Sequence, residues 1–346
     1  MQRRADFDNM KVIGIILVLL AHSTHLYTGG WAYTSPYPSN FFNIFTWYIY
    51  SFHMPLFVFI SGAVFCYASE RGKYPSLSKL FVKKIHRLLI PYLFVGLVYM
   101  IPLRIIIGYY KGVSYKSLAF DFLTTIGSGH LWYLYVLFVL TIIFWLLRPI
   151  IGKRKTYLPI FALSVILYFI SPRLPIKFLI GATAHFFIYF YLGYLFQTNR
   201  RTVLRYFREI NYKTILYTLI VQLLIFFLLR VLTENQTSLV ITGGVMIFEI
   251  FLAMIGVLLL YLVVNAIMSS RINFFNFWPL AIIKKYNMSI YLLHEPIIFA
   301  ILSYIAIVKM YPFLIVSLCF FGSLITSLLL AKIISKNKFL AFAFGS

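Results

Sequence analysis

Long apolar runs recur along the whole chain, and short polar stretches separate them. The runs cover residues 12–27, 42–67, 88–107, 131–147, 157–170, 178–196, 214–232, 245–267, 286–307 and 312–334. Most of them approach the roughly 20 residues that a helix needs to cross the hydrocarbon core of a bilayer. A backbone in lipid must satisfy its own hydrogen bonds, so continuously apolar runs of this length form helices. The pattern predicts an all-α polytopic membrane protein with about ten transmembrane helices.

Two of the runs, 12–27 and 157–170, are short for a full crossing. We expect these two segments to be tilted, half-buried or re-entrant. The longest stretch predicted on the outer side, about 108–130, is too short for an independent catalytic domain. Residues 1–346 are therefore predicted to form a single integral membrane domain, with no separate soluble domain.

The basic residues predict how the chain is oriented. If the N-terminus is inside, the outer loops hold Lys111, Lys116, Arg173, Lys177 and Lys309, while Arg104 and Arg230 lie within spans near their outer ends. The other lysines and arginines, out of 31 in the chain, fall in the inner segments. Lysine and arginine concentrate on the cytoplasmic side of membrane proteins. The asymmetry predicts that both termini are cytoplasmic, which requires an even number of spans.

Composition supports a membrane protein and argues against a nucleic-acid partner. Apolar residues make up 62% of the chain and charged residues only 11%, whereas a soluble domain is nearer half apolar and a quarter charged. The net charge of +23 would suit nucleic-acid binding if it formed a folded basic face. The basic residues instead occur in short clusters between apolar runs. The two cysteines, Cys66 and Cys319, lie within apolar runs and predict no disulfide.

One histidine is predicted deep in the first span. His22 follows Lys11 by eleven residues, so on a helix it lies roughly 16 Å further along the axis, past the middle of the membrane. Ionisable residues inside a membrane indicate functional sites. The structural alternative is a helix-end histidine bonded to a loop. His25 follows on a similar face, but without a third nearby ligand this spacing is poor for a metal, so no metal is expected.

The second span carries His53 near its start, with Pro55 two residues later and Ser61-Gly62 two turns further on. Pro55 loosens the helix, and Gly62 permits the close approach of another helix. The alternative to a functional His53 is a kinked packing helix with one bonded histidine.

A basic pair precedes the third span. Lys84 and Arg87 are three residues apart, so on a helix they share a face and could clamp a phosphate or pyrophosphate. An ordinary cytoplasmic anchor is the alternative.

Two later spans carry polar groups of their own. His130 and Trp132 open the fourth span on the outer side, where His130 could face a vestibule and Trp132 could be an interfacial anchor. In the ninth span, His294 and Glu295 form a polar island. The structural alternative is that the two side chains pair with a neighbouring helix.

Taken in order, these motifs resemble the acyltransferase-3 family of bacterial membrane O-acyltransferases over nearly the whole chain. That family has a basic residue, ten intervening residues and a histidine in its first span, here Lys11 and His22. The other matching motifs are Phe52-His53-Met54-Pro55-Leu56-Phe57 with Ser61-Gly62, Lys84-x-x-Arg87 with Pro91-Tyr92, His130-Leu131-Trp132-Tyr133-Leu134, Phe190-Tyr191-Leu192-Gly193-Tyr194 and Ser289-Ile290-Tyr291-Leu292-Leu293-His294. The family usually has Arg where Lys11 and Lys84 stand, and Lys keeps the charge without the two-pronged fork of a guanidinium.

The resemblance implies an O-acetyltransferase in the bacterial cytoplasmic membrane. It would move an acetyl group from cytoplasmic acetyl-CoA to a hydroxyl of a cell-surface polysaccharide or a lipid-linked glycan. His22 would be the general base, with a transient acyl-histidine as a variant. The implied substrate-binding residues are Lys11, Lys84 and Arg87 for the CoA phosphates, and His53, Ser61, His130 and Trp132 for the acceptor side or the oxyanion.

A glycan exporter or flippase without chemistry is the alternative function. In that case the basic pair would recognise an anionic head group, and transport would depend on Arg104 or Arg230 as much as on His22. A third possibility lies between the two, an acyl carrier that moves the acyl group across the membrane for a partner enzyme.

Overall fold

A computed structural model of the chain describes residues 5–29, 33–206, 211–234, 239–270, 274–305 and 310–345. Within these residues the regular elements are all helical, and ten helical segments are long and apolar enough to cross a membrane. They are Ala5–Tyr27, Asn40–Glu70, Leu77–Ile106, Gly129–Ile151, Arg154–Arg173, Lys177–Thr198, Tyr212–Thr233, Thr242–Ser269, Trp278–Ile305 and Pro312–Ile334. The predicted all-α architecture is confirmed. Lys309 and the last two residues of the predicted span 286–307 lie outside the described residues.

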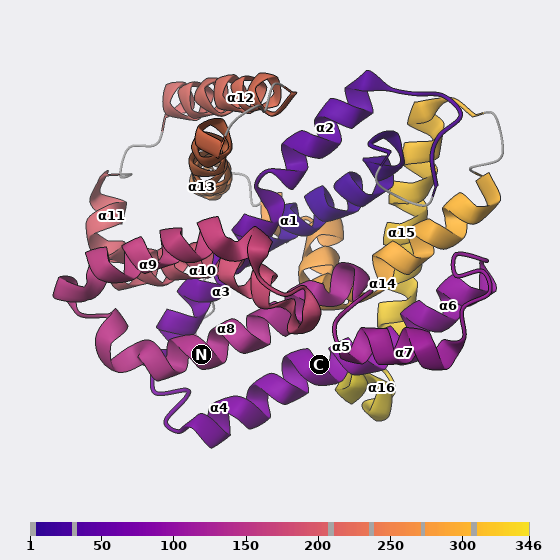
Figure 1. Cartoon of the computed structure of the whole chain (residues 1–346), viewed down its shortest axis with the longest axis horizontal. Helices are drawn as coiled ribbons and strands as arrows, with labels where there is room; N and C mark the ends of the chain where they lie inside the picture. Colours follow the sequence, from indigo (N-terminus) through magenta and orange to yellow (C-terminus); the bar gives the residue numbers. More distant parts are fainter. Residues whose placement is uncertain are drawn as a thin grey trace.

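Eight of these segments are built on one helix each, and the whole bundle is shown in Figure 1. These helices are α1 (Ala5–Thr24), α8 (Trp132–Ile151), α9 (Tyr157–Ile170), α10 (Ile180–Thr198), α12 (Tyr212–Glu234), α13 (Leu239–Ser269), α14 (Trp278–Ile305) and α15 (Pro312–Ile334). Three short helices lie between or after the spans: α7 (Tyr115–Leu123), α11 (Arg200–Tyr206) and α16 (Lys338–Ala343).

The other two segments are interrupted. The second span consists of α2 (Asn40–Tyr50) and α3 (His53–Glu70), which separate at Ser51 and Phe52. The third span consists of α4 (Leu77–Lys84), α5 (Ile90–Phe94) and α6 (Ile101–Ile106), joined by π-helical turns at Ile85–Leu89 and Val95–Met100. Such π-helical turns occur often at functional sites.

The two runs that looked short are long enough for a full crossing, so the prediction is wrong about their length. α1 extends back at least to Ala5 and so includes Asp6, which is buried in an ion pair with Arg200 of α11. Pairing shields the carboxylate from lipid, whereas hydropathy treats an acidic residue as the end of a span. The run 157–170 is lengthened by short 3-10 turns at both ends, giving Arg154–Arg173.

α3 and α10 pack in close backbone contact. A Cβ atom added at Gly62 would clash with the backbone oxygen of Phe190, and one added at Gly193 would clash with that of Phe59. Small residues let membrane helices approach in this way, so the expected close approach at Gly62 is confirmed. The contact fixes α3 against α10, whose outer halves carry His53 and His185.

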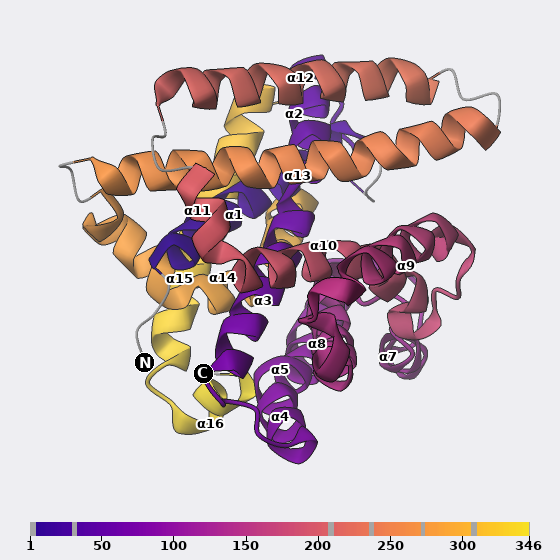
Figure 2. The same ribbon diagram turned by 90° about the vertical axis from the view of Figure 1, so that its left-hand side faces the viewer.

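Ten spans lie between the first and the last described residues, so α1 begins and α16 lies on the same side of the bundle, and both are seen in Figure 2. The backbone oxygen of Arg87 lies beside Gly345, so the basic pair is on that side too. The positive-inside rule assigns this face to the cytoplasm.

Candidate functional site

A cavity of about 1070 Å³ lies among the ends of the spans on the opposite side from the termini. Among the described residues, every spanning segment except α15 contributes to its lining. α1 contributes residues from its C-terminal end and α3 from its N-terminal end. Because successive spans run in opposite directions, these two ends lie near the same face of the membrane. By the positive-inside rule this is the outer face. Small-molecule sites typically occupy roughly 300–1,000 Å³, so the cavity has room for more than one sugar ring.

Three histidines from three spans meet on one side of this cavity, and we call His22, His130 and His294 the histidine cluster. The ring centroid of His294 lies 4.9 Å from that of His22 and 5.2 Å from that of His130. His22 is half-buried and lines the cavity, whereas His294 is fully buried. Nδ1 of His294 lies 2.8 Å from the backbone oxygen of Tyr291, so an N–H donated there holds the ring in place.

A charged network backs the histidine cluster. Nη2 of Arg104 donates to Oε1 of Glu295 at 2.5 Å, and Nδ1 of His130 lies 3.4 Å from Oε2 of Glu295. Nε2 of His130 lies 3.2 Å from the backbone oxygen of Leu292. The His130 ring therefore lies between the carboxylate of Glu295 and the backbone of α14. The side chains of Arg104 and Glu295 are each only 5% exposed, so the pair is shielded from lipid and from bulk water.

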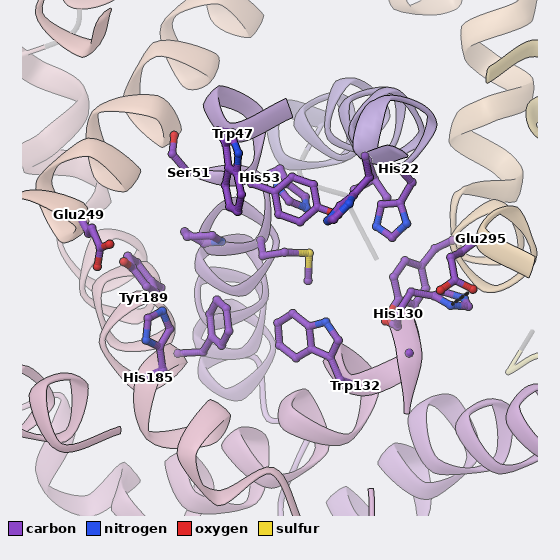
Figure 3. Close-up of a pocket in the computed structure, with 18 of the residues that line it drawn as sticks. His22, Trp47, Ser51, His53, His130, Trp132, His185, Tyr189, Glu249 and Glu295 are labelled. Carbon is purple, nitrogen blue, oxygen red and sulfur yellow. Dashed lines mark hydrogen bonds and ion pairs between the residues drawn. The ribbon is translucent and has the colours of Figure 1, made fainter. Parts of the chain in front are cut away.

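His53 and Trp132 also line the cavity, as Figure 3 shows. Nδ1 of His53 donates to the backbone oxygen of Ile49 at 2.9 Å. One ring nitrogen is therefore bonded to the backbone, as expected for a histidine in a kinked packing helix. The indole of Trp132 stacks on the ring of Phe186 with centroids 4.9 Å apart. Four predicted site residues, His22, His53, His130 and Trp132, are thus brought together in one cavity.

The other four predicted site residues, Lys11, Ser61, Lys84 and Arg87, are not in its lining. Lys11 lies 3.6 Å from Asp8 near the inner end of α1. The hydroxyl of Ser61 donates to the backbone oxygen of Phe57 at 2.8 Å and lies 3.1 Å from the hydroxyl of Tyr133. The predicted residues therefore form an outer group around the cavity, an inner group of Lys11, Lys84 and Arg87, and Ser61 in the middle of α3.

The inner side is densely cationic around Tyr74, in the loop between the second and third spans. The ammonium groups of Lys83 and Lys84 lie 6.0 and 5.7 Å from the centre of the Tyr74 ring. Burial, and then the nearby charges of Arg87 and Lys83, lower the pKa of the Lys73 ammonium. Repulsion of this kind is relieved when an anion binds, which suits a phosphate-bearing ligand.

Three residues of the outer site are not among the predicted site residues. The sequence indicates Arg104 only as a cation inside a span. It indicates His294 and Glu295 as a polar island, with His294 also in a family motif, but gives neither a role in the site. The evidence that could have identified them is their position, because ionisable groups within apolar runs are rarely structural. Within the described parts of the chain, no three His, Cys, Asp or Glu side chains are grouped so as to hold a metal ion.

Comparison with known proteins gives one match. The sequence model of a protein family described as an acyltransferase domain matches residues 4–332, nearly the whole chain. Among curated proteins and among solved structures, none matches.

Proposed function

The chain belongs to the acyltransferase-3 family and is a multi-pass membrane acyltransferase, and on this premise we propose that it transfers an acetyl group from acetyl-CoA to a hydroxyl of a surface or lipid-linked glycan. The proposed location is the bacterial cytoplasmic membrane. The observation that carries the proposal is the placement of His22, whose ring lies at the wall of a large outer cavity with two further imidazoles behind it.

The donor would bind from the cytoplasm, where acetyl-CoA is made. Lys84 and Arg87, with Lys11 at the inner end of α1, supply the positive charge that the CoA phosphates require. We propose that the pantetheine arm extends from these cations between the helices towards His22. The interrupted third span supports this route, because its π-helical turns begin directly after Lys84.

The chemistry needs a base, because a sugar hydroxyl is a poor nucleophile at neutral pH. In the proposed step His22 takes the hydroxyl proton while the oxygen bonds to the acyl carbon. The carbon–sulfur bond of the thioester then breaks, and the CoA thiolate takes the proton from His22. His130 lines the same cavity beside Glu295, and we assign it an electrostatic role towards the oxyanion. His53 keeps its second ring nitrogen for a hydrogen bond.

The test is acetyl transfer by purified protein in proteoliposomes, measured as free CoA thiol released and as acetyl added to a glycan fraction from the host. His22→Ala and His22→Gln should both lower turnover by about 10²–10⁴-fold, the usual contribution of a positioned base. Gln keeps the size and polarity of the side chain, so it controls for lost packing. Acetyl-CoA binding should remain unchanged in both. Wild-type turnover by either variant would refute the assignment of His22.

The exporter alternative predicts a different result in the same assay. A transporter consumes no acetyl-CoA, so wild-type protein would release no CoA thiol with any glycan. A strain lacking the gene would then also keep the acetyl-sized mass increments on its surface glycans, whereas our proposal predicts that they are lost.

A further inference from the structure

A second polar group lies across the cavity from the histidine cluster. It consists of Glu249 on α13, Tyr168 on α9 and His185 on α10, and we call it the facing group. The Tyr168 hydroxyl donates to Oε2 of Glu249 at 3.1 Å, and the His185 ring lies 4.3 Å from the Tyr168 ring. Figure 3 shows Glu249 and His185 on one side of the cavity, and His22, His130 and Glu295 on the other.

Glu249 does not have the surroundings of a structural carboxylate. It is exposed, whereas the ion-paired Glu295 on the opposite wall is buried. Among the described residues its hydrogen bond from Tyr168 uses Oε2, and Oε1 accepts none. A carboxylate at membrane depth without a cationic partner is costly and indicates a ligand or substrate site. Its free oxygen is an acceptor for a ligand that carries O–H groups.

Aromatic surface lies between the two polar groups. Trp132 stacks on Phe186, and both line the cavity together with Tyr189 and Trp47. Aromatic faces carry partial negative charge, so they attract the C–H groups of a sugar ring, which carry partial positive charge. A carboxylate for adjacent hydroxyls beside flat aromatic rings is the chemistry that recognises a sugar.

We propose that the facing group is the acceptor subsite, where Glu249 and Tyr168 hold the hydroxyls of a sugar ring against Trp132 and so direct another hydroxyl towards His22. This inference rests on the proposed function and names the residues that would bind its acceptor. A soluble glycan and a glycan anchored in the outer leaflet present the same sugar ring to the cavity, and the experiment distinguishes these two sources.

The experiment measures sugar binding rather than turnover. Purified full-length protein in lipid nanodiscs is titrated with methyl glycosides of glucose, galactose, mannose, N-acetylglucosamine and rhamnose, and then with the dodecyl glycosides of the same sugars. Tryptophan emission reports binding, and Trp132→Phe identifies the part of the change that arises at Trp132. We expect at least one sugar to change the emission, and Glu249→Gln to weaken its binding about tenfold or more, because hydrogen bonds to a charged acceptor are strong.

Glu70→Gln is the matched control, since it makes the same change on an exposed glutamate at the inner end of α3. It should bind the sugar like wild type. Binding of methyl and dodecyl glycosides alike would indicate a soluble acceptor, and binding of the dodecyl series alone a lipid-linked one. Either result supports the subsite. If no glycoside of either series binds, or if Glu249→Gln binds like wild type, the subsite is refuted. His22→Ala should still bind the sugar. If this variant also keeps wild-type acetyl transfer, the proposed function fails while the acceptor subsite stands, so the two failures are distinguishable.

Discussion

Arg104, Glu295 and the histidine cluster concentrate ionisable groups in the outer half of the membrane. Each such group is costly in lipid unless it is paired. Glu295 meets Arg104 on one oxygen and His130 on the other, so the charges are balanced within the protein. His294 lies between His130 and His22 and is fixed by the backbone of its own helix. The surroundings of His22 therefore depend on Arg104, Glu295 and His294, to which the proposed reaction step assigns no direct role.

Glu295→Gln tests this network. Glutamine keeps the shape of the side chain and removes the charge, which leaves Arg104 buried without its carboxylate. Removing one partner of a buried ion pair costs about 3–5 kcal/mol, so we expect a clearly lower Tm in nanodiscs. We also expect at least tenfold slower acetyl transfer, because His130 loses the carboxylate beside Nδ1.

The double variant Arg104→Gln, Glu295→Gln separates the two effects. It removes both charges, so its Tm should recover towards wild type as a double-mutant cycle of a coupled pair requires. Acetyl transfer should stay low, because His130 still lacks its partner. A single variant with wild-type Tm would show that the pair does not contribute to stability.

At the scale of elements, the contact between α3 and α10 positions the cavity wall. Gly62→Ala places a methyl group against the backbone oxygen of Phe190, so the two helices must separate. We expect a lower Tm and weaker transfer, since His53 and His185 sit on these helices. Gly244→Ala is the matched control in α13, where an added Cβ has no atom within 4 Å. Thermal unfolding of both variants measures the difference, and equal Tm values would contradict the close packing.

Continuous apolarity was sufficient to predict the spans, but it could not predict where they end. α1 extends back at least to Ala5 and includes Asp6, whose charge is buried by Arg200, far away in the sequence. α14 begins at Trp278 and includes Lys284, which donates to Asn9 at 2.8 Å and so stays inside a helix. Hydropathy depends on each residue and its neighbours in sequence, whereas these ends are fixed by partners on other helices.

The candidate site could be predicted only in part, because partners on other helices also decide which residues belong to it. His22, His53, His130 and Trp132 stand in motifs and could be identified one by one. Glu249 and His185 stand in no motif, and their relation to Tyr168 arises only when α9, α10 and α13 pack around the cavity. Spacing along one helix predicts which residues share a face, but not which face of another helix they meet.

The whole molecule is two-sided. The proposed donor cations lie with the termini on the inner side, and the cavity with its histidine cluster lies on the outer side. In the proposed reaction, an acetyl group from cytoplasmic acetyl-CoA would therefore cross much of the membrane before it meets an acceptor in the cavity. Under this proposal the spans separate a water-soluble donor from an acceptor on the opposite face.

The two-sided arrangement predicts opposite accessibility for two introduced cysteines. In a background of Cys66→Ala and Cys319→Ala, Ser51→Cys lines the cavity, and Ser78→Cys is exposed on α4. A maleimide that cannot cross membranes should label Ser51→Cys in right-side-out vesicles and Ser78→Cys only in inside-out vesicles. Any glycoside that binds the cavity should slow the first reaction and leave the second unchanged. The reverse labelling would invert the orientation and place the histidine cluster on the side of the donor, so the acetyl group would no longer have to cross the bundle.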